Sequence, residues 1–326
     1  MNAPLVSVCV PVYGVEKFIA RCARSLFSQT MQDNIEFIFV NDATPDASIS
    51  VLESVIREFP HRRPQIRIIN HDRNRGLAAA RVTAVREAKG IYIAHCDSDD
   101  WVEPDMYALM SDSAVRNDAD IVICNFFEEK AAGPQLVEQD LPTTPEKIVE
   151  SICKFEIEPR NLAPFLWNRL IRRAFYIDNS FFADERISFC EDLAVTIPMH
   201  ICSDKVALVE KPLYHYNMTN IGSMTQEKSL KKIESCRLAK ENITRFLHNR
   251  SADKLLPFID LRWFFYYLPL ITSTECYNPR LWRTLVNPDI KPNLVSRSRI
   301  SFWLARHRMY TLNHLLNIAV KRLFNK

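Results

Sequence analysis

Glycine is scarce in this sequence, with 5 residues among 326. None of them forms the G-x-G-x-x-G or G-x-x-x-x-G-K-[ST] patterns with which loops cradle phosphates. The nine cysteines include no C-x-x-C pair, so the sequence indicates no zinc site. Their odd number and scattered positions fit small buried residues in a reducing compartment. A phosphate-bearing ligand would therefore have to be bound in some other way.

Long apolar runs are also missing. The longest, residues 263–271, is half the length of about 20 residues that a membrane span requires, and it contains a proline. The N-terminus has no basic region before its first apolar segment, so we expect no cleaved signal. A net charge of +3 is too small for this length to indicate nucleic acid. We expect a cytoplasmic globular protein of one large domain with an appendage, or of two domains.

The first 130 residues alternate between segments typical of buried strands and segments typical of amphipathic helices. Runs rich in Val, Ile and Phe indicate strands at residues 6–13, 35–42, 66–70, 91–97 and 119–127. Helical spacing indicates helices at 17–29, 47–59 and 76–89, the last ended by Gly90, and another that opens at Pro104. This alternation predicts an α/β fold with a Rossmann-like, mostly parallel sheet and helices on both faces.

Acidic residues follow the fourth expected strand, in the stretch HCDSDDW at 95–101. Parallel strands end at one edge of their sheet, and ligands bind there. With the period of two of a strand, Asp97 and Asp99 project to the same side. Two carboxylates suit a hard divalent cation, Mg²⁺ or Mn²⁺, that would neutralise a diphosphate. The alternative is that these acids cap the helix near Pro104. Asp100 has no assigned role.

Four motifs stand in order at matching strand ends. They are VSVCVPVYG at 6–14, FVNDATPD at 39–46, NRGLAAAR at 74–81 and HCDSDDW at 95–101. This combination resembles the inverting family 2 glycosyltransferases of the GT-A fold, over residues 5–225. The resemblance implies a nucleotide-sugar donor, with a UDP-sugar expected first, a Mg²⁺ or Mn²⁺ ion on its diphosphate, and a glycan or lipid-linked acceptor in the synthesis of surface polysaccharide.

The same resemblance implies which residues bind the donor. Pro11, Tyr13, Asp42, Asn74 and Arg81 would form the pocket of the base, Asp97 would lie at the ribose and the metal, and Asp99 would bind the metal. Each position has a simpler interpretation. Tyr13 could be a rim aromatic, Asp42 could form an Asx-turn, and Arg81 could be a solvated surface charge.

The second half should supply a base and bind the acceptor. In inverting transfer a carboxylate takes the proton of the acceptor hydroxyl. The segment SFCEDLAVTIPMHI at 188–201 places Glu191 and Asp192 before apolar residues at helical spacing. By resemblance Asp192 is the base and Glu191 an orienting or acceptor-binding neighbour. The alternative is that both acids are there because the N-terminus of a helix favours negative charge.

Two later segments also resemble the family. PFLWNRLIRRAFY at 164–176 carries Arg169 where a lysine is usual, and its Trp167 either stacks on a sugar or packs in the core. YHYNMTNIGSMT at 214–225 resembles the loop that closes over the donor diphosphate. His215 or Ser223 in that loop could reach phosphate or metal, although a histidine between two tyrosines also fits a structural role.

We expect residues 1–225 to form the glycosyltransferase domain, with a nucleotide-sugar half at 1–110 and an acceptor half at 111–225. Residues 226–326 would be a helical C-terminal extension, which has no acid after Asp289. Residues 300–324 mix aromatic and basic residues, which fits a helix lying on anionic lipid at the inner face of the membrane. A packed helix with a basic outer face fits equally.

Other functions on a similar sheet remain as alternatives. A sugar-nucleotide nucleotidyltransferase would have a basic, glycine-rich loop after the first strand, and PVYGVEKF at 11–18 is not one. A phosphatase of the haloacid dehalogenase type uses Asp-x-Asp after its first strand rather than its fourth. A non-catalytic module that binds a sugar nucleotide or a glycan would bind nucleotide without needing Asp192.

Overall fold

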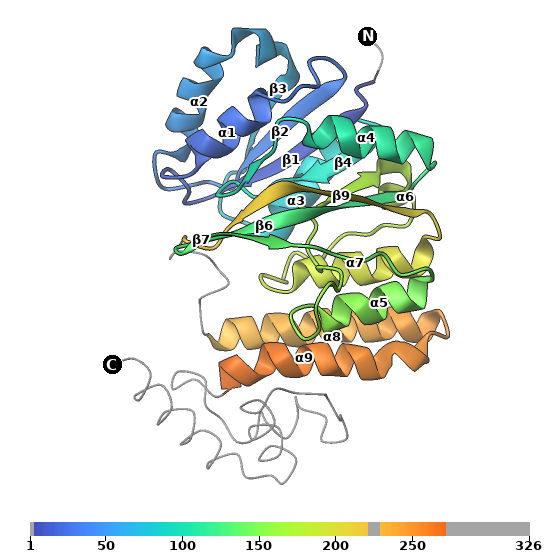
Figure 1. Cartoon of the computed structure of the whole chain (residues 1–326). Helices are drawn as coiled ribbons and strands as arrows, with labels where there is room; N and C mark the ends of the chain where they lie inside the picture. Colours follow the sequence, from blue (N-terminus) through green and yellow to red (C-terminus); the bar gives the residue numbers. More distant parts are fainter. Residues whose placement is uncertain (1–2, 221–228, 272–326) are drawn as a thin grey trace.

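A nine-stranded sheet forms the centre of the protein in the computed structural model, which describes residues 3–220 and 229–271 (Figure 1). The strand order is β3-β2-β1-β4-β8-β6-β9-β5, and β7 pairs with β6. The strands are β1 (Val6–Val12), β2 (Ile35–Asn41), β3 (Ile66–Asn70), β4 (Tyr92–His95), β5 (Trp101–Val102), β6 (Ile121–Lys130), β7 (Gly133–Val137), β8 (Arg169–Arg172) and β9 (Val206–Asn217).

Helices connect these strands. They are α1 (Ile19–Phe27), α2 (Ser48–Glu58), α3 (Leu77–Glu87), α4 (Met106–Arg116), α5 (Pro145–Lys154), α6 (Arg173–Asp178), α7 (Glu191–Cys202), α8 (Leu230–Asn249) and α9 (Leu256–Ile271), with short 3-10 turns at Pro60–Gln65 and Asp253–Leu255. All the strands and helices expected in the first 130 residues are present, with ends shifted by a few residues. Short β5 precedes α4 and was not expected.

Two apolar cores cover the two faces of the sheet. One contains the buried residues of α1, α2 and α4, and the other those of α3, α5, α7, α8 and α9. In Figure 1, α5, α7, α8 and α9 lie below the sheet as successive layers. The expected α/β fold, with a mostly parallel sheet and helices on both faces, is confirmed. Only β5, β7 and β8 run against their neighbours among the described strands.

The order of the first four strands changes direction at β1. β1 lies between β2 and β4 and is parallel to both, so the chain moves outward from β1 to β3 and then returns through α3 to β4 on the other side. Parallel sheets bind ligands at the point where the strand order changes direction in this way. The carboxyl ends of β1, β2 and β4 meet at this point.

Two parts of the expected C-terminal extension can be distinguished. α8 and α9 belong to the described residues and share the apolar core of α5 and α7. The expected basic helix at 300–324 lies outside the described residues. Among the described helices, none combines the length and the hydrophobicity needed to cross a lipid bilayer. The domain boundary near residue 225 stays a prediction.

Gly90 has a different role from the expected one. α3 ends at Glu87, and its C-cap Ala88 is extended, so Gly90 does not end the helix. Instead, the backbone approaches β1 closely here. A Cβ at Gly90 would lie 2.6 Å from both the backbone N and the Oγ of Ser7. The N–H of Gly90 donates to that Oγ at 2.7 Å, and the hydroxyl donates to Glu36 at 2.6 Å.

Replacing Gly90 with Ala should lower the free energy of unfolding by about 1–3 kcal/mol, because the new Cβ would force β1 and β4 apart. Urea unfolding measures this change. Ile91→Ala is the matched control, since Ile91 is half exposed and its truncation should cost less than about 0.5 kcal/mol. Equal midpoints for Gly90→Ala and the unchanged protein would contradict this account.

Candidate active site

The acidic stretch after β4 is a turn and not the end of a strand. β4 stops at His95, and the N–H of Asp100 donates to the carbonyl of Asp97 at 3.1 Å. The expected strand alternation therefore does not place Asp97 and Asp99. The turn itself leaves these two side chains partly exposed and buries Ser98 and Asp100. None of these acids caps α4, whose N-cap residue is Asp105.

Asp100 holds this turn in place. Its carboxylate accepts hydrogen bonds from the hydroxyl of Tyr214 and from the backbone N–H of Asn217, both at 2.7 Å. Tyr214 also accepts a hydrogen bond from the N–H of Asp97 at 3.0 Å. Burial, with the nearby charges of Asp99 and Asp97, raises the pKa of Asp100 well above its ordinary value. Asp100 is thus a buried brace that fixes Asp97 and Asp99.

Asp99 faces the end of β9. Asn220 donates to its Oδ2 at 2.8 Å, and the side chain of Asn217 donates to its backbone carbonyl at 3.1 Å. Burial, and then the charge of Asp97, raises the pKa of Asp99. The segment that follows β9 therefore braces the turn, a role that the sequence did not reveal. The only signal was the run of Asn and Tyr in YHYNMTN.

Arg81 brings together acids from both halves of the chain. Its guanidinium donates from Nη2 to Asp97 at 2.8 Å, and from Nη1 to Glu191 at 2.8 Å and Asp192 at 2.5 Å. The Arg81 side chain is only 4 % exposed, so the interpretation of it as a solvated surface charge is wrong. The base expected in the acceptor half and a metal ligand expected in the donor half thus share one cation.

Burial is the largest single influence on the pKa values of Arg81, Glu191 and Asp192. It disfavours the charge of Arg81, but the three surrounding carboxylates raise the pKa of Arg81 well above its ordinary value. Burial, and then the charge of Asp192, raises the pKa of Glu191 to about 7. Burial also raises the pKa of Asp192, against the opposing effect of Arg81. These carboxyl groups are the kind of perturbed group that active sites contain.

Glu191 and Asp192 form the first turn of α7, as expected. The residue before them, Cys190, adopts the left-handed conformation with φ of 66° and makes no side-chain cap. The positive end of α7 lies beside both acids, so the helix favours their negative charge. They do not simply satisfy that helix end, because both carboxylates accept hydrogen bonds from Arg81.

Asp42 organises the loop after β3. Its carboxylate accepts hydrogen bonds from the N–H groups of Arg75 and Gly76, both at 2.8 Å, and lies 2.7 Å from Nδ1 of His71. The turn before ATPD is closed by Asn41 rather than by Asp42, because Oδ1 of Asn41 accepts from the N–H of Thr44. The Asp42 side chain is 4 % exposed, and these three contacts use three of the about four acceptor positions of a carboxylate. Whether it binds a base stays a prediction.

The other expected donor residues lie on the same edge of the sheet. Pro11 is buried within β1, and Tyr13, directly after β1, is 48 % exposed. Asn74 is exposed in the loop after β3, where its Oδ1 accepts from the N–H of Gly76 at 3.0 Å. The loops after β1 and β2 are joined by the hydrogen bond from Gly14 N–H to Thr44. The structure thus presents one continuous edge formed by three loops.

Trp167 and Arg169 are structural. Trp167 is buried and stacks on Tyr214 at a ring distance of 4.3 Å, so it packs in the core rather than on a sugar. Arg169 is also buried and donates to the carbonyls of Ala163 and Phe165. Burial raises the pKa of Asp192, and the charge of Arg169, like that of Arg81, opposes this rise. Arg169 thus adds a second positive charge near Asp192.

His215 is held away from any ligand role. Its ring stacks between Trp101 and Phe127, and its nitrogens lie 2.7 Å from Glu129 and 2.8 Å from Glu103. Ser223 lies outside the described residues. The interpretation of His215 as a structural residue therefore fits better than contact with phosphate or metal.

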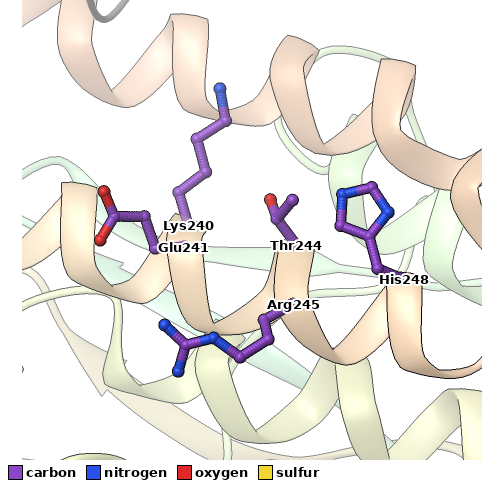
Figure 2. A pocket seen from close by; sticks show the side chains of 5 residues that line it. All are labelled: Lys240, Glu241, Thr244, Arg245 and His248. Carbon is purple, nitrogen blue, oxygen red and sulfur yellow. The ribbon is translucent and has the colours of Figure 1, made fainter.

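A separate hollow of about 410 Å³ lies on α8 (Figure 2). It is lined by Lys240, Glu241, Thr244, Arg245 and His248, which share one face of that helix. Lys240 reaches α9, where it pairs with Asp260 at 2.6 Å. The hollow contains none of the residues of the acidic cluster, so it is not part of the candidate active site.

A family comparison connects this geometry to a known class. Residues 7–179, which include the turn after β4 and Arg81, match the model of the family Glycosyl transferase family 2. The matched region covers more than half of the chain. The chain belongs to glycosyltransferase family 2. The resemblance carried by the four strand-end motifs is thereby confirmed.

Similar members of glycosyltransferase family 2 occur in Bacillus subtilis. The uncharacterized glycosyltransferase EpsJ is 36 % identical over 228 residues, which are 68 % of this chain and 63 % of EpsJ. A second glycosyltransferase, EpsH, is 34 % identical over 254 residues, which are 77 % of this chain and 71 % of EpsH. The chain thus spans less than two thirds of the length of EpsJ.

Solved structures share the fold. S. aureus TarS 1-349 in complex with UDP-GlcNAc superposes with a TM-score of 0.69 at 16 % identity, covering 97 % of this chain and 91 % of TarS. The mannosyltransferase PcManGT from Pyrobaculum calidifontis, in complex with GDP-Man and Mn²⁺, superposes with a TM-score of 0.55 at 16 % identity, covering 100 % of this chain and 89 % of PcManGT. The expected GT-A fold is confirmed.

The difference in unfolding free energy between Glu191→Gln and the unchanged protein should shift in favour of the variant as the pH rises from about 4.5 to about 7. In the folded state Glu191 has a raised pKa of about 7, so the folded protein retains a proton that the unfolded chain has lost. The unchanged protein therefore loses stability across this range, and the Gln variant lacks that contribution. Urea unfolding at pH 5 and pH 8, in the presence of a chelator, measures the difference.

The contrary outcome is an equal difference in unfolding free energy at both pH values. Glu185→Gln is the control, because Glu185 lies in the segment just before Glu191 but is exposed and pairs with Arg75. That variant should show no growth of the difference with pH.

Proposed function

We propose that the protein is an inverting glycosyltransferase that moves a sugar from a nucleotide sugar, with UDP as the nucleotide, to a glycan or lipid-linked acceptor of surface polysaccharide. One observation carries this proposal. Asp97 from the turn after β4 and Glu191–Asp192 from the start of α7 lie on one buried guanidinium, at the edge where the sheet binds ligands. The carboxylate expected to bind the donor and the expected base would thus be adjacent.

The donor would bind along the edge formed by the loops after β1, β2 and β3. Pro11 and Tyr13 would line the base, and Asp42 would accept a hydrogen bond from it with its remaining acceptor position. Asn74 and Arg81 would complete the pocket, and Arg81 would act through Asp97. The complexes of TarS with UDP-GlcNAc and of PcManGT with GDP-Man support a nucleotide-sugar donor in this fold.

Asp97 and Asp99 fit a divalent cation. Their oxygens are the hard donors that Mg²⁺ and Mn²⁺ prefer, and the pKa of Asp99 is raised by burial and by the charge of Asp97, a repulsion that a cation would relieve. Among the described residues no cluster of three or more His, Cys, Asp or Glu could hold a metal alone. A site of two carboxylates completed by the donor phosphates agrees with both facts, and Mn²⁺ in PcManGT supports it. When bound, the cation would neutralise the charge of the leaving diphosphate.

Asp192 would be the base. Inversion requires that an acceptor hydroxyl attack the anomeric carbon from the face opposite the nucleotide, and the oxygen loses its proton as the new bond forms. Asp192 would take that proton on its carboxylate, which Arg81 holds from one side. Glu191, on the same guanidinium nitrogen, would orient the acceptor. A positioned carboxylate of this kind contributes about 10²–10⁴-fold to the rate.

Two alternative functions differ from this proposal in the reaction that they predict. A nucleotidyltransferase would form the sugar nucleotide from a nucleoside triphosphate and release pyrophosphate. A non-catalytic module would bind nucleotide sugar and transfer nothing. We place the enzyme in the cytoplasm or at the inner face of the membrane, in contact through the basic residues 300–324, which lie outside the described residues.

Asp192→Asn should lower the rate of sugar transfer by about 10²–10⁴-fold and leave the affinity for UDP in the presence of Mn²⁺ nearly unchanged, because it removes only the base. Asp99→Asn should instead weaken Mn²⁺-dependent binding of UDP. The measurements are release of UDP from a panel of UDP-, GDP- and TDP-sugars with Mn²⁺, and calorimetric binding of UDP with and without the metal.

Asp112→Asn is the matched control, since Asp112 is an exposed carboxylate on α4 and both measurements should stay as in the unchanged chain. Full transfer by Asp192→Asn would refute the assignment of the base. An affinity for UDP that is the same with and without Mn²⁺ would refute the role of Asp99.

A further inference from the structure

Arg81 joins two parts of the active site that are far apart in sequence. It lies on α3, in the donor half, while Glu191 and Asp192 are 110 and 111 residues further along the chain, in the acceptor half. Its side chain is almost fully buried. In the described part of the chain its Nε is buried without a hydrogen-bond partner, so every contact of the guanidinium goes through Nη1 and Nη2 to carboxylates.

Nη1 and Nη2 of Arg81 contact different carboxylates. Nη2 donates to Oδ1 of Asp97, one of the two carboxylates that would hold a divalent cation. Nη1 donates both to Glu191 and to Oδ1 of Asp192, which fixes the side chain of the base. The rigid planar fork of an arginine allows this division, because its donors have fixed directions. A single group therefore touches both the donor side and the base.

We propose that Arg81 is a positioning residue that couples the metal carboxylate Asp97 to the base Asp192, competing with the cation for Asp97 while holding Asp192 in place. This inference rests on the proposed function. Without donor, Arg81 neutralises Asp97. With a cation at Asp97, the guanidinium is left to Glu191 and Asp192.

The proposal has a consequence that a purely structural arginine would not have. Removing the positive charge at Arg81 should make Asp97 and Asp99 a better site for a cation, because both a competitor and a like charge are lost. The same change should slow transfer, because Asp192 loses its anchor. Cation affinity and turnover should therefore change in opposite directions.

Arg75 provides the matched control. In the loop before α3, it pairs at 3.1 Å with Glu185, which lies in the segment before α7 and is also 110 residues further along the chain. These side chains are 36 % and 45 % exposed, and the pair lies outside the cluster of Asp97, Glu191 and Asp192. Arg75→Met removes the same charge from an ion pair with the same sequence separation. It should leave the affinity for Mn²⁺ within about twofold, because screened surface charges interact weakly.

The experiment uses the full chain with Arg81→Met, Arg81→Lys and Arg75→Met. Binding of Mn²⁺ without nucleotide is measured by electron paramagnetic resonance, and kcat and the donor KM are measured with the active UDP-sugar. Arg81→Met should bind Mn²⁺ about tenfold more tightly and lose about 100-fold in kcat, with a smaller change in KM. Arg81→Lys should bring Mn²⁺ affinity back toward that of the unchanged chain and recover part of kcat, since an ammonium restores charge but not the fork.

Mn²⁺ affinity that is equal or weaker in folded Arg81→Met would overturn the proposal, as would a kcat equal to that of the unchanged protein. Circular dichroism establishes whether this variant folds. If it does not, Arg81→Lys decides, because full kcat in that variant would show that the fork is not needed. If the unchanged chain transfers no sugar at all, the proposed function fails, and the Mn²⁺ measurements still decide whether Arg81 competes for Asp97.

Discussion

The contact of one buried guanidinium with three carboxylates is the constraint on which the rest of the site depends. Glu191 and Asp192 are largely removed from bulk water and Asp97 is partly removed from it, and removing a charge from water is costly unless it is paired. Arg81 supplies that pairing, and its own charge is stabilised in turn. The acceptor half could not bury Glu191 and Asp192 alone, because the cation that pairs with them comes from α3 in the donor half. The fold must therefore bring α3 and α7 together against the same face of the sheet, and their side chains share one apolar core there.

The carboxylates are held in place by groups that take no part in chemistry. Asp100 accepts from Tyr214 and from the N–H of Asn217, so the end of β9 fixes the turn that presents Asp97 and Asp99. Asp42 does the same for the loop after β3 through the N–H groups of Arg75 and Gly76. In both cases a buried carboxylate replaces the glycine-rich loop that the sequence lacks. Hydrogen bonds from backbone N–H groups fix both loops, and the loop after β3 includes Gly76 with a positive φ of 91°.

The sequence predicted the strands and helices of the donor half because each has a strong local pattern, and it predicted the edge of the sheet because parallel strands end together. The sequence could not predict the partners of Arg81. A run such as GLAAARV in a helix looks the same whether its arginine faces water or carboxylates 110 residues away. The same limit applies to Gly90, where the approach of β1 and not the end of a helix requires the missing side chain. Local patterns find elements, whereas the pairing of buried charges depends on which elements later pack together.

The balance of charge explains why such a site suits a donor that arrives with a cation. Arg81 pairs with three carboxylates, those of Asp97, Glu191 and Asp192, and Asp99 lies in the same turn as Asp97. These four carboxylates outnumber the guanidinium groups of Arg81 and Arg169, so the ionised cluster is acidic and would repel a free diphosphate. The raised pKa values of Asp99, Glu191 and Asp192 follow from the same excess together with burial. A divalent cation between Asp97 and Asp99 would reverse the sign of the potential on the donor side only, because Glu191 and Asp192 stay with Arg81. The anionic donor is then attracted, and the base beside it remains a carboxylate able to accept a proton.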